Sequence, residues 1–225
     1  MRAIVFDFDG VIANSEPLHF RAFRDVLAEE GITLTEADYY AVYLGFSDAG
    51  VFQAIGAARD AWTPAYIGGL VARKAVRLEA LERDVSVLFP GAAAAVRRAA
   101  AAVPIAIASG ARGAEIRRAL ERENLVGCFT AIVAAEDTPL SKPAPDPYLR
   151  ALALLRAARG DEIAASDCVA IEDSRWGLES ARAAGLRTVA VTQTYDVSAL
   201  TGTADLVIES LESLDLAALA RLCSS

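Results

Sequence analysis

Six short apolar runs separated by helical patterns constrain the fold of this 225-residue chain more than any other feature. The runs are rich in β-branched and aromatic side chains, which is typical of buried strands. They are Ala3–Phe8, Pro104–Ala108, Ala131–Ala135, Cys168–Ile171, Thr188–Val191 and Asp205–Ile208. Because helices alternate with the strands, the sequence predicts an α/β core with a doubly wound, Rossmann-like parallel sheet.

The helical patterns fall into two groups. Those that alternate with the strands are Ala92–Ala102, Ala114–Asn124, Pro147–Arg159, Gly177–Ala184 and Leu211–Leu222. Those that directly follow the first strand, with no strand between them, are Pro17–Gly31, Glu36–Leu44, Ala49–Ala58 and Ile67–Arg83. We interpret the second group as an inserted all-helical cap domain. The expected division is a core at residues 1–14 and 87–225 and a cap at residues 15–86.

Composition excludes several classes of protein. An apolar content of 54% with 23% charged residues suits a globular chain and argues against a disordered one. The longest stretch without a charge, residues 99–111, contains a proline and is shorter than the roughly 20 apolar residues that span a bilayer. Aspartates interrupt the apolar run at the N-terminus, so no signal peptide is indicated there. We therefore expect a cytoplasmic protein without a membrane partner.

Charge and metal-binding side chains narrow the possible functions further. The 22 basic and 30 acidic residues give a net charge of −8, which argues against nucleic acid as a partner. The three widely spaced cysteines form neither a disulfide framework nor a zinc motif. The single histidine nearly excludes a histidine-based metal site. Since no long heptad repeat marks an interface, a monomer is the default expectation.

Acidic residues follow two of the predicted strands. At the end of the first, Asp7 and Asp9 lie two residues apart, so their carboxylates can divide nucleophilic attack and proton transfer between them. After the fourth, Glu172 and Asp173 can join Asp7 around a hard divalent cation, and oxygen ligands suit Mg²⁺. Each pair also has a plainer explanation, because acids are common in loops and at the start of helices.

Two further segments offer groups that bind anions. Ser109 and Gly110 follow the second strand and precede a helix, as in phosphate sites, although serine is also a common N-cap. Lys142 follows the third strand. Only Lys74 and Lys142 among the 22 basic residues are lysines, which favours a specific role for each over a solvated position. Because parallel strands end at one edge of a sheet, all four segments are expected to meet there.

The four segments together resemble the motifs of the haloacid dehalogenase-like superfamily. The motifs are Asp7–Val11, Ser109, Lys142 with Pro143, and Glu172–Ser174, and the resemblance extends from residue 1 to about residue 191. An all-helical cap after the first motif is typical of the β-phosphoglucomutase and phosphoglycolate phosphatase-like group. The segments at residues 17–23 and 141–146 are similar to that group as well.

The resemblance implies a role for each motif. Asp7 is implied to attack phosphorus and form an aspartyl-phosphate, while Asp9 protonates the leaving oxygen and then deprotonates water. Mg²⁺ is implied to bind the Asp7 carboxylate, the Asp9 carbonyl and Asp173, with Glu172 close by. The implied phosphate-binding residues are Ser109, Gly110 and Lys142. Dehalogenases of the superfamily lack the second aspartate of the first motif, so Asp9 favours phosphoryl transfer.

Three cap residues are candidates for substrate contacts. His19 and Lys74 match cap positions that lie near the substrate in β-phosphoglucomutase-like proteins. The plainer alternatives are helix packing for His19 and a solvated face for Lys74. Glu16 is a weaker candidate, since the first turn of a helix favours an acid anyway.

One cap loop departs from the mutase pattern. Mutase-like proteins carry an arginine after Gly-x-Ser that holds the phosphate that is not transferred. Here Gly45-Phe46-Ser47 is followed by Asp48, which would repel a second phosphate, although Arg59 or Arg73 can substitute for the missing arginine.

We therefore expect a Mg²⁺-dependent phosphatase acting on a small phosphorylated metabolite of the sugar phosphate or phosphoglycolate class. The alternatives are a β-phosphoglucomutase-like mutase, a non-catalytic binding protein of the same fold, and a dehalogenase.

Overall fold

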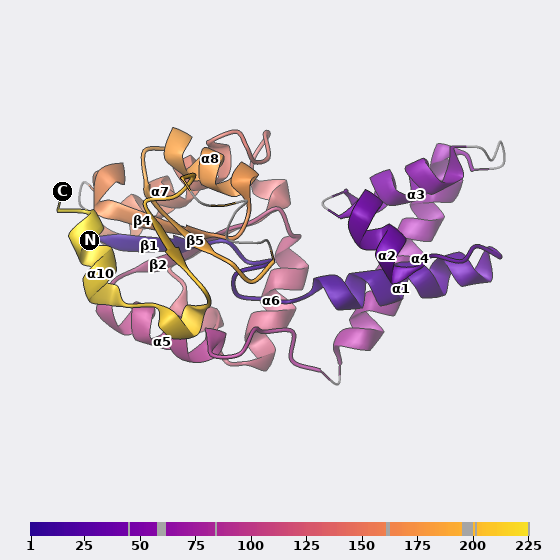
Figure 1. Ribbon diagram of the computed structural model, residues 1–225, viewed down its shortest axis with the longest axis horizontal. Helices are drawn as coiled ribbons and strands as arrows, with labels where there is room; N and C mark the ends of the chain where they lie inside the picture. The colour runs from indigo at the N-terminus through magenta and orange to yellow at the C-terminus, as the bar shows by residue number, and fades with distance from the viewer. Residues whose placement is uncertain are drawn as a thin grey trace. The chain divides into compact units, whose positions relative to one another are not determined.

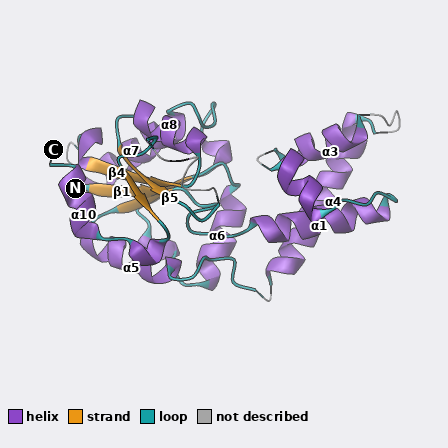
Figure 2. Ribbon diagram, viewed as in Figure 1, coloured by secondary structure: helices purple, strands orange, loops and turns teal. Residues whose placement is uncertain are grey.

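The computed structural model describes residues 1–44, 46–57, 62–83, 85–160, 163–194, 200 and 202–224 (Figure 1). The chain divides into two compact units, one formed by Met1–Asn14 with Ser86–Ser225 and one by Ser15–Val85. The sheet lies in the first unit, and the secondary structure described in the second is helical (Figure 2). The predicted α/β core with a helical insertion is therefore confirmed.

Six parallel strands form one sheet in the described part of the chain, in the order β3-β2-β1-β4-β5-β6. They are β1 (Ala3–Phe6), β2 (Ile105–Ala108), β3 (Ala131–Val133), β4 (Cys168–Glu172), β5 (Arg187–Val191) and β6 (Leu206–Ile208). The central strand β1 pairs with β2 and β4, and Val5 lies opposite both Ala106 and Ala170. The chain extends the sheet first to one side of β1 and then to the other, which makes the carboxyl end of β1 a switch point for ligand binding.

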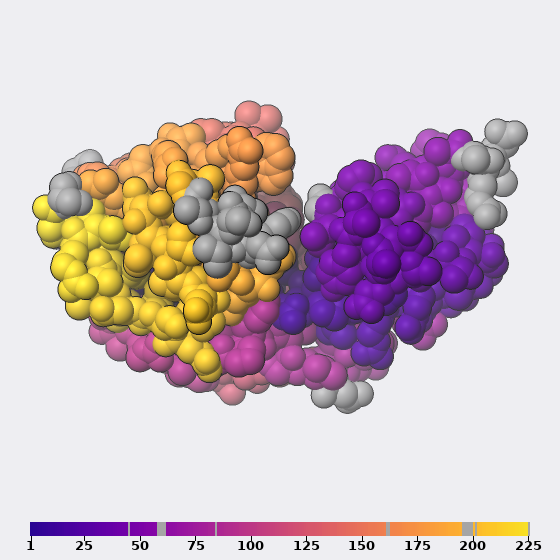
Figure 3. Space-filling model, in the orientation of Figure 1, coloured from indigo at the N-terminus to yellow at the C-terminus, as the bar shows by residue number. Residues whose placement is uncertain are grey.

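Helices pack on both faces of this sheet. They are α5 (Ala92–Ala102), α6 (Gly113–Arg122), α7 (Asp146–Arg159), α8 (Arg175–Ala183) and α10 (Leu216–Leu222). Helices α7 and α8 cover one face, and α5 lies on the other (Figure 1). The core under α7 joins Val5, Ala106 and Ala170 of the strands to Leu152 and Leu155 of the helix, all almost completely buried. In the space-filling view, the C-terminal segment covers part of this unit (yellow in Figure 3).

The second unit has an apolar core of its own. Its helices are α1 (Glu16–Glu29), α2 (Glu36–Asp38), the π-helical turn η1 (Tyr39–Tyr43), α3 (Asp48–Gly56) and α4 (Pro64–Glu82). Helix α1 packs along α4, and Phe23, Val26 and Leu27 of α1 meet Phe52 and Leu70 in the centre of the cluster. No helix among the described residues combines the length and the apolar character of a membrane span.

Two predicted helices are interrupted in the structure. The pattern at residues 36–44 forms the short helix α2 followed by a π-helical turn, which places the Tyr39 ring beside Phe20 and Phe23. The pattern at residues 211–222 forms a 3₁₀ turn and then α10, because Leu214 is extended. Asp215 starts the new helix by accepting a hydrogen bond from the backbone N–H of Ala217, at 2.9 Å.

The two faces of α7 predict effects of very different size for the same substitution. Leu155 is fully buried in the core, so Leu155→Ala is expected to lower the free energy of unfolding by about 2–5 kcal/mol. Leu149 on the same helix is 48% exposed, and Leu149→Ala is expected to cost less than about 0.5 kcal/mol. Urea unfolding of both variants measures the difference, and equal costs would contradict the assignment of the α7 faces.

Candidate active site

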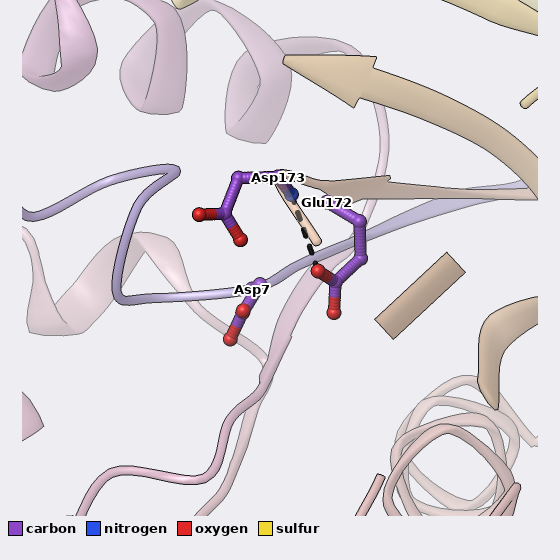
Figure 4. A group of neighbouring side chains, drawn as sticks. All are labelled: Asp7, Glu172 and Asp173. Carbon is purple, nitrogen blue, oxygen red and sulfur yellow. Dashed lines mark hydrogen bonds between the residues drawn. The ribbon is translucent and has the colours of Figure 1, made fainter. Parts of the chain in front are cut away.

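Three buried carboxylates converge at the carboxyl edge of the sheet (Figure 4). Asp7 directly follows β1, and its backbone N–H donates to the carbonyl of Ile171 on β4, at 2.9 Å. Glu172 ends β4 and Asp173 follows it. One oxygen from each of the three carboxylates lies within 4.8 Å of the others. The structure therefore brings together acids that lie 165 positions apart in the sequence, from residue 7 to residue 172.

The crowding of these carboxylates affects their protonation. Burial raises the pKa of Asp7 well above its usual range, and the charge of Glu172 adds to this effect. Burial and the same neighbour raise the pKa of Asp173 to about 7. Three acidic oxygen donors in a buried position suit a hard divalent cation, whose charge would offset both burial and mutual repulsion.

Lys142 places one positive charge among these acids. Its Nζ lies 3.0 Å from Oδ1 of Asp7 and 2.5 Å from Oε1 of Glu172. Burial opposes the charge on this ammonium group, but the two carboxylates outweigh burial and raise the pKa of Lys142. The lysine is therefore a fixed cation of the site, and the solvated alternative is wrong.

Glu172 is held by donors on both of its oxygens. The hydroxyl of Tyr148 donates to Oε1 at 2.7 Å, beside the bond from Lys142. The other oxygen, Oε2, accepts hydrogen bonds from the backbone N–H of Asp173 and from the hydroxyl of Ser174, both at 3.2 Å. These contacts fix the position of the carboxylate, although the sequence analysis assigned no role to Tyr148.

Asp9 lies in the turn after β1 and is half-buried. The next residue, Gly10, has a φ of +77°, and a Cβ there would lie 1.8 Å from Oδ2 of Asp173. The segment after β5 also holds this turn, because the side chain of Gln193 donates to the carbonyls of Gly10 and Val11, at 3.2 and 3.1 Å. Only a glycine allows this close approach to Asp173.

The polar residues after β5 were missed in the sequence analysis. Gln193 holds the turn after Asp9, and the Thr194 hydroxyl hydrogen-bonds to Asp173. The signal that identified the four motifs, polar side chains directly after a predicted strand, is present here as well.

Ser109 and Gly110 follow β2, which pairs directly with β1. The Ser109 side chain is buried, and its Oγ accepts a hydrogen bond from the backbone N–H of Ala111 at 3.1 Å. Gly110 is exposed, and a Cβ added to it would meet nothing within 4 Å. Because the serine oxygen acts as an acceptor for the turn, the hydroxyl hydrogen stays available to donate to an anion.

The cap candidates form a polar cluster within the second unit. Lys74 is fully buried, and its Nζ lies 2.9 Å from Nδ1 of His19 and 2.8 Å from Oδ1 of Asp48. Glu16 accepts a hydrogen bond from the hydroxyl of Tyr39. The alternative of a solvated Lys74 is therefore wrong, and His19 has a specific polar partner besides its packing.

Arg59 and Arg73 are the two arginines that could substitute for the arginine of the mutase pattern. The Arg73 guanidinium bonds to Glu29 at 2.5 Å and to Glu30 at 2.7 Å, on an exposed face of the cap. Gly45 and Arg59 lie outside the described residues.

His19 is held in its neutral form. Burial lowers its pKa from 6.5 to about 3, and the neighbouring ammonium of Lys74 contributes to the same shift. Since Lys74 donates to Nδ1, the proton of the neutral ring is on Nε2.

The lowered pKa of His19 predicts that the cap loses stability at acidic pH. The histidine of the unfolded chain binds a proton near pH 6.5 and that of the folded chain only near pH 3, so the unfolded state binds more protons between these values. Stability is therefore lost progressively as the pH falls from 6.5 towards 3. Because the chain has one histidine, its proton NMR titration reads the pKa directly. A midpoint near 6.5 would contradict the buried pair, and His19→Gln should remove this part of the pH dependence.

The substitution Gly177→Ala is expected to disturb the acidic cluster. A Cβ at this position would lie 1.9 Å from Oε1 of Glu172, so Gly177→Ala must displace the carboxylate. We expect at least tenfold weaker binding of a divalent cation, measured by calorimetry. Gly68→Ala is the control, because a Cβ there meets nothing within 4 Å, and alanine should stabilise α4 by about 0.5–1 kcal/mol. Equal cation binding in both variants would contradict the role of Glu172.

Comparison with known proteins places the chain in a family. The family model described as haloacid dehalogenase-like hydrolase matches residues 1–185. Protein CbbY of Rhodobacter capsulatus is 32% identical over 206 residues, which cover 87% of each chain. Hexitol phosphatase B of Escherichia coli strain K12 is 31% identical over 194 residues, which cover 84% of this chain and 82% of that protein.

A solved structure has a similar fold. The crystal structure of β-phosphoglucomutase from Clostridium difficile aligns with a TM-score of 0.81 at 19% identity, covering 100% of this chain and 97% of that one. The match to the family model and the identity with protein CbbY show that the chain belongs to the haloacid dehalogenase-like hydrolase family.

Proposed function

We propose that the protein is a Mg²⁺-dependent phosphatase that hydrolyses a small phosphorylated metabolite, of the sugar phosphate or phosphoglycolate class, through an aspartyl-phosphate on Asp7. The observation that carries the proposal is the contact of Asp7 with Lys142, 3.0 Å apart, beside two further buried acids. This arrangement combines a nucleophile with the positive charge that a phosphoryl group requires. The similarity to hexitol phosphatase B supports the reaction class.

Asp7 is oriented for attack on phosphorus. Its Oδ1 accepts from the backbone N–H of Phe8 at 2.7 Å and contacts Lys142, so Oδ2 is the oxygen that attacks. As the bond from Oδ2 to phosphorus forms, the ester bond breaks and the leaving oxygen takes a proton from Asp9. Water then attacks phosphorus and gives a proton to Asp9, while the bond between phosphorus and Oδ2 of Asp7 breaks. This step releases inorganic phosphate and restores the Asp7 carboxylate.

The residues that would hold Mg²⁺ are Asp7, Asp173 and the backbone carbonyl of Asp9, with Glu172 close by. When bound, the ion supplies positive charge that offsets the repulsion between the carboxylate nucleophile and the phosphoryl oxygens. Ser109 then donates its hydroxyl hydrogen to a phosphoryl oxygen.

Two further groups complete phosphate binding. The backbone N–H of Gly110, an exposed residue, and the ammonium of Lys142 donate to the phosphoryl oxygens in this proposal. The ammonium has three N–H donors, and two of them are directed at carboxylates, so the third serves the substrate.

The cap cluster selects the leaving group in this proposal, through Glu16, His19 and Lys74. The charge of Lys74 is balanced by Asp48, 2.8 Å away, so this lysine does not supply an unpaired charge for a second phosphate. This pairing favours a phosphatase over the alternative β-phosphoglucomutase-like mutase.

Removal of the nucleophile tests the mechanism. Asp7→Asn is expected to lower kcat at least about 10³-fold, because a carboxamide is a poor nucleophile. Phosphate release under steady-state conditions measures the effect. Asp215→Asn is the control, since this acid is 61% exposed and starts helix α10. More than a few per cent of the wild-type rate in Asp7→Asn would contradict the assignment.

A substrate panel tests the reaction class. We expect steady release of inorganic phosphate from one or more of β-glucose 1-phosphate, phosphoglycolate and sugar bisphosphates, abolished by EDTA and restored by Mg²⁺. Conversion of β-glucose 1-phosphate to the 6-phosphate without net release would instead identify a mutase. Mg²⁺ binding without any turnover would identify a binding protein, and halide release from a 2-haloacid would identify a dehalogenase.

A further inference from the structure

Tyr148 touches both members of the ion pair beside the nucleophile. It lies in the first turn of α7, is fully buried, and donates its hydroxyl to Oε1 of Glu172 at 2.7 Å. The Nζ of Lys142 lies 5.3 Å from the centre of its ring. One side chain therefore holds the acid through its hydroxyl and faces the cation with its ring.

Packing alone does not account for this residue. Tyr148 belongs to the apolar cluster under α7 with Ala151 and Leu152, where a phenylalanine would fill the same volume. The hydroxyl is the part that a packing role does not need, and it is directed at the oxygen that also binds Lys142. Without the hydroxyl, Oε1 of Glu172 keeps only the Lys142 ammonium group as a donor. The orientation of the carboxylate is then less restricted.

The position of Lys142 depends on this carboxylate. Two of its three N–H donors point to Asp7 and Glu172, and these two bonds set the direction of the third. A rotation of the Glu172 carboxylate therefore turns the remaining N–H away from its ligand. The same rotation moves an oxygen of the acidic cluster that suits a divalent cation.

We propose that Tyr148 is a positioning residue of the phosphatase site, which aligns Glu172 and, through it, the third N–H of Lys142. The inference rests on the proposed function, because it assumes that this N–H binds a phosphoryl oxygen. The Tyr148 hydroxyl donates to Glu172, so in this proposal it acts on the phosphoryl group through that carboxylate. Its loss should therefore weaken anion and cation binding together while the fold remains intact.

The variant Tyr148→Phe tests this role, because it removes the hydroxyl and keeps the ring. We expect the dissociation constants of Mg²⁺ and of inorganic phosphate, both measured by calorimetry, to rise about tenfold or more, with a parallel fall in kcat. The matched control is Tyr66→Phe, which deletes a tyrosine–glutamate hydrogen bond to Glu30 on the cap surface. Its constants should equal those of the wild type.

A spectroscopic measurement separates positioning from stability. The chain has two lysines, so ¹⁵N labelling of lysine yields two side-chain signals, and Lys74→Arg assigns them. We expect the Lys142 signal to shift in Tyr148→Phe and that of Lys74 to stay, with the midpoint of thermal unfolding nearly unchanged. This readout needs neither Mg²⁺ nor turnover, so it remains valid if the proposed activity fails.

Two results would overturn the inference. One is a Tyr148→Phe protein whose Mg²⁺ and phosphate constants lie within twofold of the wild type. The other is an unshifted Lys142 signal, even where binding is weaker, because binding would then be lost through general destabilisation. If Tyr148→Phe is too unstable to purify, Glu172→Gln provides the test, since it removes the acceptor charge that links the tyrosine to Lys142. An unshifted Lys142 signal in that variant would overturn the inference equally.

Discussion

The burial of negative charge at the end of the central strand is the constraint on which the rest of this site depends. Asp7, Glu172 and Asp173 are at most 7% exposed, and the charge of Glu172 raises the cost of ionising both Asp7 and Asp173. Such a cluster is stable only if positive charge or hydrogen-bond donors compensate it. Lys142, the tyrosine hydroxyl and the backbone N–H groups after β4 provide this compensation within the chain.

The second unit also buries a charge, but this charge is positive. There a lysine is fully buried, and a carboxylate together with a neutral histidine accepts its hydrogens. The lysine also lies 4.7 Å from the centre of the Phe23 ring, so an apolar core surrounds the charge. Both units therefore place one of the two lysines of the chain in a largely buried position beside a carboxylate.

The sequence predicts the fold well because its signals are local. Strand bounds differ from the expected ones by two residues at most, and residues that follow strands, such as Asp7 and Lys142, lie where parallel topology places them. Tyr148 escaped prediction because its role depends on the turn of α7 that faces Glu172, which no periodicity shows. The pairing of Asp48 with Lys74 escaped for the same reason, since it joins two helices of the cap. The break at Leu214 depends on one capping side chain.

The order of the strands has a consequence for how the chain is made. The first strand synthesised becomes the centre of the sheet, and it pairs with β4 only after residues 168–172 have emerged. Until then the edge of β1 that faces β4 lacks a partner, and apolar residues such as Phe6 are without their final cover. The helical unit that follows β1 has its own core and so can fold during this interval. A nascent chain stalled before β4 would therefore combine a folded cap with an unpaired strand edge, which can pair with strands of other chains.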